Sequence, residues 1–142
     1  FISVCYLNGN LVQENRRLST MKSITKIKKQ ARRKMNSELV DTIQNSAKNE
    51  NWKNVANILS MPRRKRIILN LDEIGDAAKD GETIVVPGKV LSQGELNKKI
   101  KIIALAFSEN ARDKLSRNKI SFSTIEEEIK NNPEAKGLRI LR

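Results

Sequence analysis

Histidine is absent from the 142-residue sequence, cysteine occurs once, at Cys5, and aromatic residues make up only 4% of the chain. Without histidine, the commonest general base and the commonest zinc ligand are both missing. A single cysteine forms neither an intramolecular disulfide nor a thiolate metal cage. No apolar run approaches the roughly 18 residues of a membrane span, and the apolar patch over residues 1–7 lacks the features of a secretory signal. We therefore expect no cofactor, no metal, no membrane contact and no small-molecule substrate.

What the sequence does contain is typical of one basic globular domain. Hydrophobic residues make up 38% of the chain, which suffices for an ordinary core at this length. The 28 Lys and Arg against 16 Asp and Glu give a net charge of +12. So high a charge on a small protein calls for a polyanionic partner, first of all nucleic acid.

Most of this charge lies toward the N-terminus. Residues 1–34 hold nine Lys and Arg and one Glu, and therefore carry +8 of the +12. We interpret residues 1–20 as an upstream or gene-model extension, with Met21 as the start, and predict a basic RNA-binding arm over residues 21–35, partly disordered on its own. Residues 36–142 then form a single globular domain. The alternative for the arm is a solvated tail that binds nothing.

Helical periodicity marks the beginning of the domain. An N-cap at Asn36 or Ser37, followed by apolar residues at helical spacing, predicts a helical hairpin over about residues 37–60 that ends before Pro62. Trp52 falls in register with the apolar stripe of the second helix. It is therefore interpreted as a core residue rather than as a platform for base stacking.

Short strands and short helices then alternate along the chain, which predicts an α/β layer with a helical entrance. Asp72 is assigned as the cap of the first short helix, and Pro87-Gly88 as the end of the second strand. The third strand is expected to be half-buried, with Lys99 and Lys101 on its outer face. The expected strands cover residues 67–71, 83–86, 98–107, 120–122 and 138–141, and the expected helices cover 72–78, 108–117 and a segment opened by a capping box at 123–126 that ends before Pro133.

Gly88-Lys89 suggests a phosphate-binding loop, but the rest of that motif is missing. Gly81 lies seven residues before Gly88 instead of five, and Val90 stands where a Ser or Thr would hold magnesium. Gly88 is better explained as a turn residue with positive φ that displays Lys89 at the tip of the turn. The local sequence leaves open whether Lys89 contacts a phosphate or only water.

The acidic clusters do not indicate catalysis. Adjacent residues on a helix point in different directions, so Glu126, Glu127 and Glu128 cannot converge on one ion, and the helix dipole already explains them. The acids over residues 72–80 lack the spacing of a calcium loop. No enzyme signature remains.

The basic residues give the clearest functional signal. Arg63–Arg66 are four consecutive cations whose nearest acids in sequence are Glu50 and Asp72, so they predict a dense positive edge. Arginine suits bidentate phosphate contact, and the shortage of aromatics favours recognition of folded RNA over single strands. The candidate RNA-binding residues are Lys22, Lys26, Lys28, Lys29, Arg32, Arg33, Lys34, Arg63, Arg64, Lys65, Arg66, Lys89, Lys98, Lys99 and Lys101.

Two separated segments resemble a known family. The run NILSMPRRKRIILNL at residues 57–71, and VVPGKVLSQGEL at residues 85–96, resemble motifs of the large-subunit ribosomal protein eighteen family of archaea and eukaryotes. The segments 100–108 and 132–140 also match, so the resemblance covers about residues 35–142. The chain ends without the basic extension of the eukaryotic members, which favours the archaeal type.

The resemblance implies both a fold and a function. The family is similar in fold to bacterial ribosomal protein fifteen, with an irregular β-β-α superhelical core, here preceded by a helical hairpin and a basic N-terminal arm. It implies a structural, non-catalytic constituent of the large ribosomal subunit in the cytoplasm that binds ribosomal RNA and neighbouring large-subunit proteins and supports translation. The alternative is a free-standing, non-specific nucleic-acid chaperone or regulator, and an enzyme with an unrecognised site is a distant third.

Overall fold

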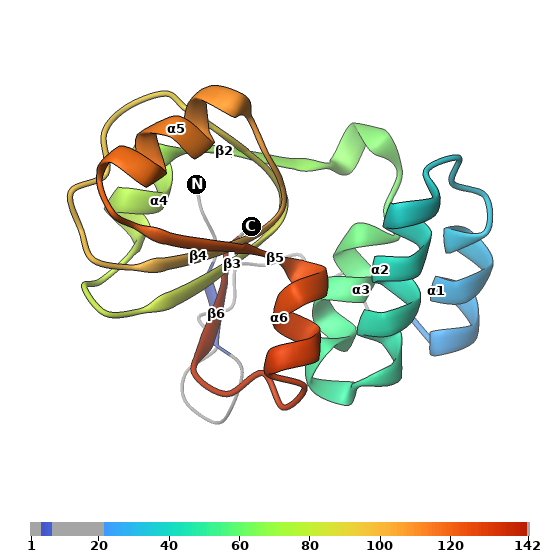
Figure 1. The fold of residues 1–142 in the computed structure, drawn as a ribbon. Helices are drawn as coiled ribbons and strands as arrows, with labels where there is room; N and C mark the ends of the chain where they lie inside the picture. The colour runs from blue at the N-terminus through green and yellow to red at the C-terminus, as the bar shows by residue number, and fades with distance from the viewer. Residues whose placement is uncertain (1–3, 7–21, 142) are drawn as a thin grey trace.

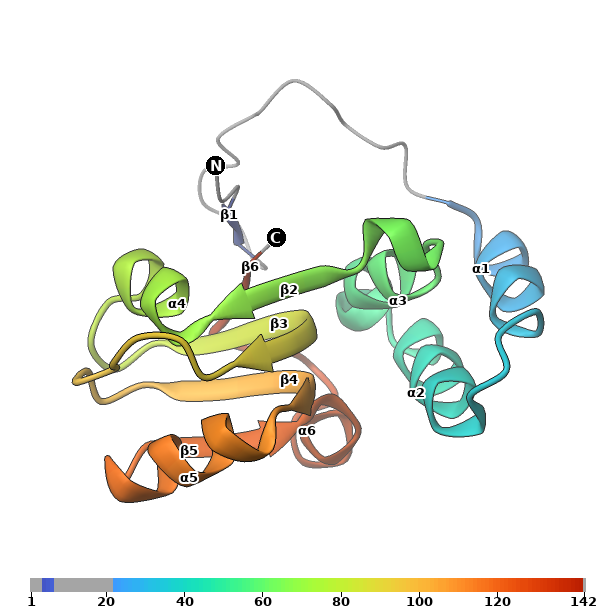
Figure 2. The same cartoon turned by 90° about the horizontal axis from the view of Figure 1, so that it is seen from above.

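The computed structural model describes residues 4–6 and 22–141 and places a sheet between layers of helices (Figures 1 and 2). The α/β class expected from the alternation of elements is confirmed. The helices are α1 (Ile24–Ala31), α2 (Ser37–Lys48), η1 (Glu50–Trp52), α3 (Lys53–Leu59), η2 (Arg63–Lys65), α4 (Leu71–Ala77), α5 (Glu109–Arg117) and α6 (Ile125–Asn131), where η marks a 3-10 helix. The strands are β1 (Val4–Tyr6), β2 (Ile67–Asn70), β3 (Thr83–Leu91), β4 (Lys101–Phe107), β5 (Ser121–Thr124) and β6 (Leu138–Leu141).

Strand β3 is the centre of the sheet. It pairs in parallel with β4 along one side, and β4 pairs in parallel with β5. On its other side, β6 pairs with the first half of β3, at Thr83–Val85, and β2 pairs with the second half, at Gly88–Leu91. Strand β1 is antiparallel to β6 at the edge of the sheet. One long strand therefore holds three others.

The helices cover both faces of the sheet because the chain reverses its direction across it. Helices α4 and α5 follow β2 and β4 and lead to the adjacent strand, whereas α6 leads back from β5 across β4 and β3 to β6. Since such connections are right-handed, a step in the opposite direction puts the helix on the opposite face. Figure 1 shows α4 and α5 on one face, and α6 with α2 and α3 on the other.

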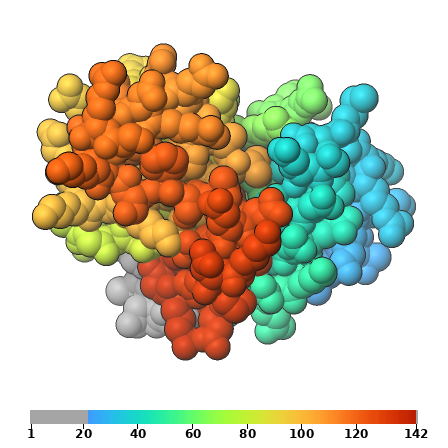
Figure 3. Space-filling model, in the orientation of Figure 1, coloured from blue at the N-terminus to red at the C-terminus, as the bar shows by residue number. Residues whose placement is uncertain are grey.

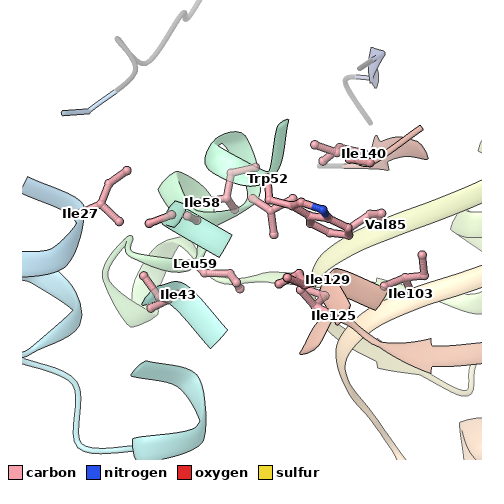
Figure 4. Close-up of a cluster of buried hydrophobic side chains, with 14 of the residues drawn as sticks. Ile27, Ile43, Trp52, Ile58, Leu59, Val85, Ile103, Ile125, Ile129 and Ile140 are labelled. Atoms are coloured by element: carbon pink, nitrogen blue, oxygen red, sulfur yellow. The ribbon is translucent and has the colours of Figure 1, made fainter. Parts of the chain in front are cut away.

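The hydrophobic core is accordingly split into two clusters. On the face of α4 and α5, Ile84 and Ile102 pack with Leu115, whereas Val85 and Ile103 point to the opposite face and pack with the helical hairpin (Figure 4). Strands β3 and β4 are thus buried on both faces, as central parallel strands are. The prediction of a half-buried strand over residues 98–107 with a basic outer face was wrong, because a strand on either side and helices on both faces leave no solvated face.

The predicted helical hairpin over residues 37–60 is confirmed as α2, η1 and α3. Asn36 is its N-cap, and its side chain accepts a hydrogen bond from the Glu38 N–H at 3.1 Å. Trp52 is fully buried, as predicted, and its Nε1 donates to the Asn132 carbonyl at 3.0 Å. Figure 4 shows the indole lying between the hairpin and the sheet, close to Val85. Trp52 therefore joins the hairpin to the end of α6.

Part of the segment expected to be an arm is packed against the domain. Ser23 caps helix α1, whose residues Ile27 and Ala31 are fully buried against α2 and α3. Ile24, Ile27 and Ala31 recur at helical spacing, a signal that the surrounding lysines obscured. Of the predicted extension over residues 1–20, residues 4–6 form β1, whereas residues 1–3 and 7–20, and the predicted start at Met21, lie outside the described residues.

Two of the predicted helix caps were assigned one or two residues from their true positions. Helix α4 is capped by Asn70, whose N–H donates to the Glu73 carboxylate at 2.8 Å, and not by Asp72, which accepts from the Glu95 N–H at 3.2 Å. The capping box of α6 is formed by Thr124 and Glu127, one residue beyond the predicted pair.

The predicted turn at Pro87-Gly88 was also wrong, because both residues lie within β3, at an irregularity where the register with β4 shifts between Val86 and Lys89. Gly88 does not adopt a positive φ. A Cβ built on it would lie 1.9 Å from the Ile67 carbonyl oxygen, so glycine is needed here for the close approach of β2. Lys89 is consequently an exposed residue within a strand rather than at the tip of a turn.

We expect Gly88→Ala to destabilise the protein by about 1–3 kcal/mol or more, because the added methyl overlaps rigid backbone of β2. The control is Gly75→Ala in α4, where the added methyl meets only the flexible end of Leu96 at 3.0 Å and helix propensity improves. Urea unfolding of both variants measures the difference. Equal stabilities would show that β2 yields easily at Gly88.

Candidate nucleic-acid interface

The basic residues of two distant segments, 22–34 and 60–66, meet where α1 packs against the end of α3. Lys34 Nζ donates to the Met61 carbonyl at 2.9 Å. At the other end of α1, Lys22 Nζ donates to Gln30 Oε1 at 2.9 Å and to Ser60 Oγ at 3.4 Å. These bonds hold the start of the chain segment that carries Arg63–Arg66. The structure thus brings together two groups of candidate residues that the sequence keeps 30 residues or so apart.

Like charges crowd each other at this junction. The pKa of Lys34 is lowered from its ordinary value, first by burial and then by the nearby Arg66, Lys22 and Arg63. The pKa of Lys22 is lowered in the same way, by burial and then by Lys26 and Lys65. Among the described residues, no carboxylate forms a salt bridge with Arg63, Arg64, Lys65 or Arg66. The junction therefore carries a positive charge that the described part of the protein does not neutralise.

The cations line a cleft of about 450 Å³ between the connection from α1 to α2 and the chain around η2. Arg33, Lys34, Arg63 and Arg66 contribute to its walls, and we call it the basic cleft. A concave, positively charged surface raises the local concentration of anions and suits a phosphate backbone.

A second hollow, of about 340 Å³, lies between the helical hairpin and the sheet, and we call it the interlayer hollow. Arg66 and Lys89 contribute to its lining, together with apolar residues such as Leu39 and Ile68. Asn36, Leu39 and Arg66 line both the interlayer hollow and the basic cleft, so the two adjoin. Lys89 thereby belongs to the same side of the molecule as Arg66.

The predicted basic edge at Lys98, Lys99 and Lys101 is largely committed to internal contacts. Lys98 Nζ donates to the carbonyls of Gly75 and Ala78, at 2.6 and 2.9 Å, at the end of α4. Lys101 Nζ lies 2.6 Å from the carboxylate of Glu128, whose side chain is only 5% exposed. Lys99 alone of the three is exposed and makes no such contact among the described residues.

The remaining candidates, Lys26, Lys28, Lys29 and Arg32, are exposed on or just after α1. The sequence analysis missed two exposed apolar residues, one in the basic cleft and one in the interlayer hollow. Met35 is 95% exposed and lines the basic cleft, and Ile68 is 57% exposed and lines the interlayer hollow. Neither position has a pattern that would reveal its exposure, because each is an apolar residue beside a basic run.

Metal-ligand clusters and membrane-spanning helices are both absent from the described residues. In that part of the chain no group of His, Cys, Asp and Glu could hold a metal ion. None of its helices is long and apolar enough to cross a membrane. The cations of the basic cleft, which no described carboxylate neutralises, are the chemically distinctive feature, and such a cluster suits an anionic partner.

We expect Lys101→Met to destabilise the protein by about 1–3 kcal/mol, because it leaves the buried Glu128 carboxylate without its cation. Lys99→Met, the exposed neighbour, is the matched control and should change stability by less than about 0.5 kcal/mol. Urea unfolding measures both. If Lys101→Met unfolds at the wild-type urea concentration, Lys101 is not a structural lysine and returns to the set of RNA-binding candidates.

Comparison with known proteins gives consistent matches. A family model for ribosomal proteins, described as covering 50S-L15, 50S-L18e and a 60S counterpart, matches residues 54–118. The chain is 45% identical over 91 residues to large ribosomal subunit protein eL18 of Methanoregula boonei, covering 64% of this chain and 75% of that protein. It is 43% identical over 115 residues to the eL18 protein of Archaeoglobus fulgidus, covering 77% and 98%, and 35% identical over 114 residues to that of Methanothermobacter thermautotrophicus, covering 76% and 94%.

Proposed function

Because this chain belongs to the family of large ribosomal subunit protein eL18, in its archaeal form, we propose that it is a structural constituent of the large ribosomal subunit that binds ribosomal RNA through the basic cleft. It works as a component of the ribosome in translation and not as an enzyme. Its partners are large-subunit ribosomal RNA and neighbouring large-subunit proteins, and its location is the ribosome, in the cytoplasm.

The observation that carries the proposal is the cluster of cations without counter-charges. Burial and then the nearby Arg66 and Arg63 lower the pKa of Lys34, and the part due to the arginines means that these cations repel one another in the free protein. Phosphates placed among them would relieve that repulsion and release counterions from the RNA. The arrangement is therefore more favourable in a complex with RNA than in the free protein.

The structure also allows the candidate residues to be ranked. We assign the main phosphate contacts to Arg33, Arg63, Arg64, Lys65, Arg66 and Lys89. Lys22 and Lys34 have a supporting role, because their ammonium groups also bind Ser60 and the Met61 carbonyl at the end of α3. The exposed face of α1, with Lys26, Lys28, Lys29 and Arg32, extends this surface, so the described part of the expected arm acts at the interface as a packed helix more than as a free arm. Lys98 and Lys101 are assigned to folding because their ammonium groups are engaged within the protein.

We expect the triple variant Arg63→Gln/Arg64→Gln/Arg66→Gln to bind large-subunit ribosomal RNA at least about tenfold more weakly at moderate salt. The slope of the logarithm of the binding constant against the logarithm of the salt concentration should become smaller by about 2, because each lost phosphate contact removes roughly 0.7 to 0.9 from it. The melting temperature should stay nearly unchanged, since all three side chains are exposed.

The matched control is Arg112→Gln/Arg117→Gln/Lys119→Gln, which removes the same charge from exposed positions on and after α5. Filter binding over a range of salt concentrations compares the two triple variants. An equal loss in both would mean that net charge and not the basic cleft holds the RNA. Sucrose-gradient sedimentation separates the ribosomal role from that of a free-standing chaperone. The wild-type protein should sediment with the large subunit if it is ribosomal, whereas a free-standing chaperone would stay near the top of the gradient.

A further inference from the structure

The interlayer hollow differs in chemistry from the basic cleft beside it. Its lining includes the apolar side chains of Leu39 and Ile58 on the helical side, and of Ile67, Ile68 and Leu105 on the sheet side. A volume of about 340 Å³ falls within the usual range of small-ligand sites, roughly 300 to 1,000 Å³. In Figure 3 the helical region, in cyan, and the C-terminal elements, in orange and red, meet along an indented seam. The hollow is therefore a small, largely apolar recess in a surface that is otherwise strongly basic.

Charges are distributed unequally between the two walls of the hollow. The cations come from the sheet wall, where Arg66 immediately precedes β2 and Lys89 lies opposite Ile68 in the register of β2 and β3. The carboxylates come from the helical wall, where Glu38 lies on α2 and Glu126 on α6. The sheet wall thus favours a phosphate, and the helical wall favours a group that donates hydrogen bonds.

The hollow also adjoins the proposed RNA surface. Arg66 lines both the hollow and the basic cleft, together with Asn36 and Leu39. A phosphate backbone seated on the basic cleft therefore passes the mouth of the hollow at Arg66. Ile68, which is 57% exposed in the free protein, lies in this apolar recess and is accessible to the sugars and bases attached to that backbone.

We propose that the interlayer hollow receives the base of one nucleotide extruded from folded RNA, while Arg66 and Lys89 hold the adjacent phosphates. The inference rests on the proposed function and adds to it a single-nucleotide site. An unstacked base is flat and apolar on its faces and polar at its edges, which matches apolar walls with polar groups at their margins. The carboxylates of Glu38 and Glu126 accept from the amino group of guanine, cytosine or adenine, whereas uracil has no amino group to donate.

The test uses the full-length protein and two RNA hairpins that differ only in one bulged nucleotide. We expect the wild-type protein to bind the hairpin with a bulged guanine about tenfold more tightly than the fully paired hairpin, the size of effect typical for one accommodated base. A 2-aminopurine at the bulge should change its fluorescence on binding. Equal affinity for the two hairpins would overturn the proposal.

Two variants test whether the hollow causes this preference. Ala106→Phe fills the hollow without a change of charge, and should abolish the preference for the bulged hairpin while leaving the affinity for the paired hairpin unchanged. Because a phenylalanine in β4 can also disturb folding, Ile68→Ala serves as a second variant at an exposed position and should reduce the preference several-fold. Ile24→Ala is its matched control, since Ile24 is also an exposed isoleucine but does not line either hollow.

The two proposals fail in different ways. If the basic cleft does not bind RNA, the variant with Arg63, Arg64 and Arg66 replaced will bind both hairpins as the wild type does. If only the base site is wrong, that variant will lose affinity for both hairpins, and Ile68→Ala and Ala106→Phe will leave the preference between them unchanged. A preference that persists in a correctly folded Ala106→Phe protein overturns the base site even where RNA binding itself is confirmed.

Discussion

The structure depends on the burial of β3 on both faces and both edges. Along its length this strand pairs with β4 on one side, and with β6 and then β2 on the other. Alternate side chains of its first half join the two halves of the core, because Ile84 and Val86 pack under α4 and α5 whereas Val85 packs under the hairpin. Its second half needs glycine at residue 88, since the backbone of β2 passes where a side chain would stand.

The position of the basic cleft follows from this pairing. Once β2 is registered on β3, Ile67 pairs with Gly88 and Arg66 immediately precedes the strand. The three preceding cations lie in the short passage from α3 to β2 (Figure 2). The same register places Lys89 opposite Ile68. The pairing of β2 with β3 therefore fixes the positions of these cations. A rigid surface loses less conformational entropy when it binds RNA than a flexible tail does. The site is a consequence of the fold more than of the basic segments taken alone.

The sequence was sufficient to predict most helices and strands, but not the contacts between segments that are distant along the chain. Apolar periodicity located the hairpin, Trp52 in the core, and most strands and helices, because burial against one neighbour already creates that pattern. It failed at Gly88 and at residues 98–101, where the cause lies in segments distant along the chain: the β2 backbone in one case, and Glu128 with the carbonyls at the end of α4 in the other. It also failed at α1, where three apolar residues at helical spacing were outweighed by seven cations. For the site, the charge pattern selected the segments around Lys34 and Arg63–Arg66, but their meeting could be seen only in three dimensions.

Net charge is consequently a poor measure of what this protein offers to a polyanion. Lys98 and Lys114 each donate to two backbone carbonyls, and these bonds attach the loop between β3 and β4 to α4 at one end and to α5 at the other. Lys101 neutralises a buried carboxylate. These ammonium groups satisfy acceptors that would otherwise be left without partners, so removing them costs folding energy before it costs binding. The cations around η2 differ because no carboxylate in the described part of the chain offsets them and their neighbours are of like charge. We therefore expect cations without a carboxylate partner and with like-charged neighbours, such as Arg63–Arg66, to contribute more to RNA binding than lysines whose ammonium groups are held by internal acceptors.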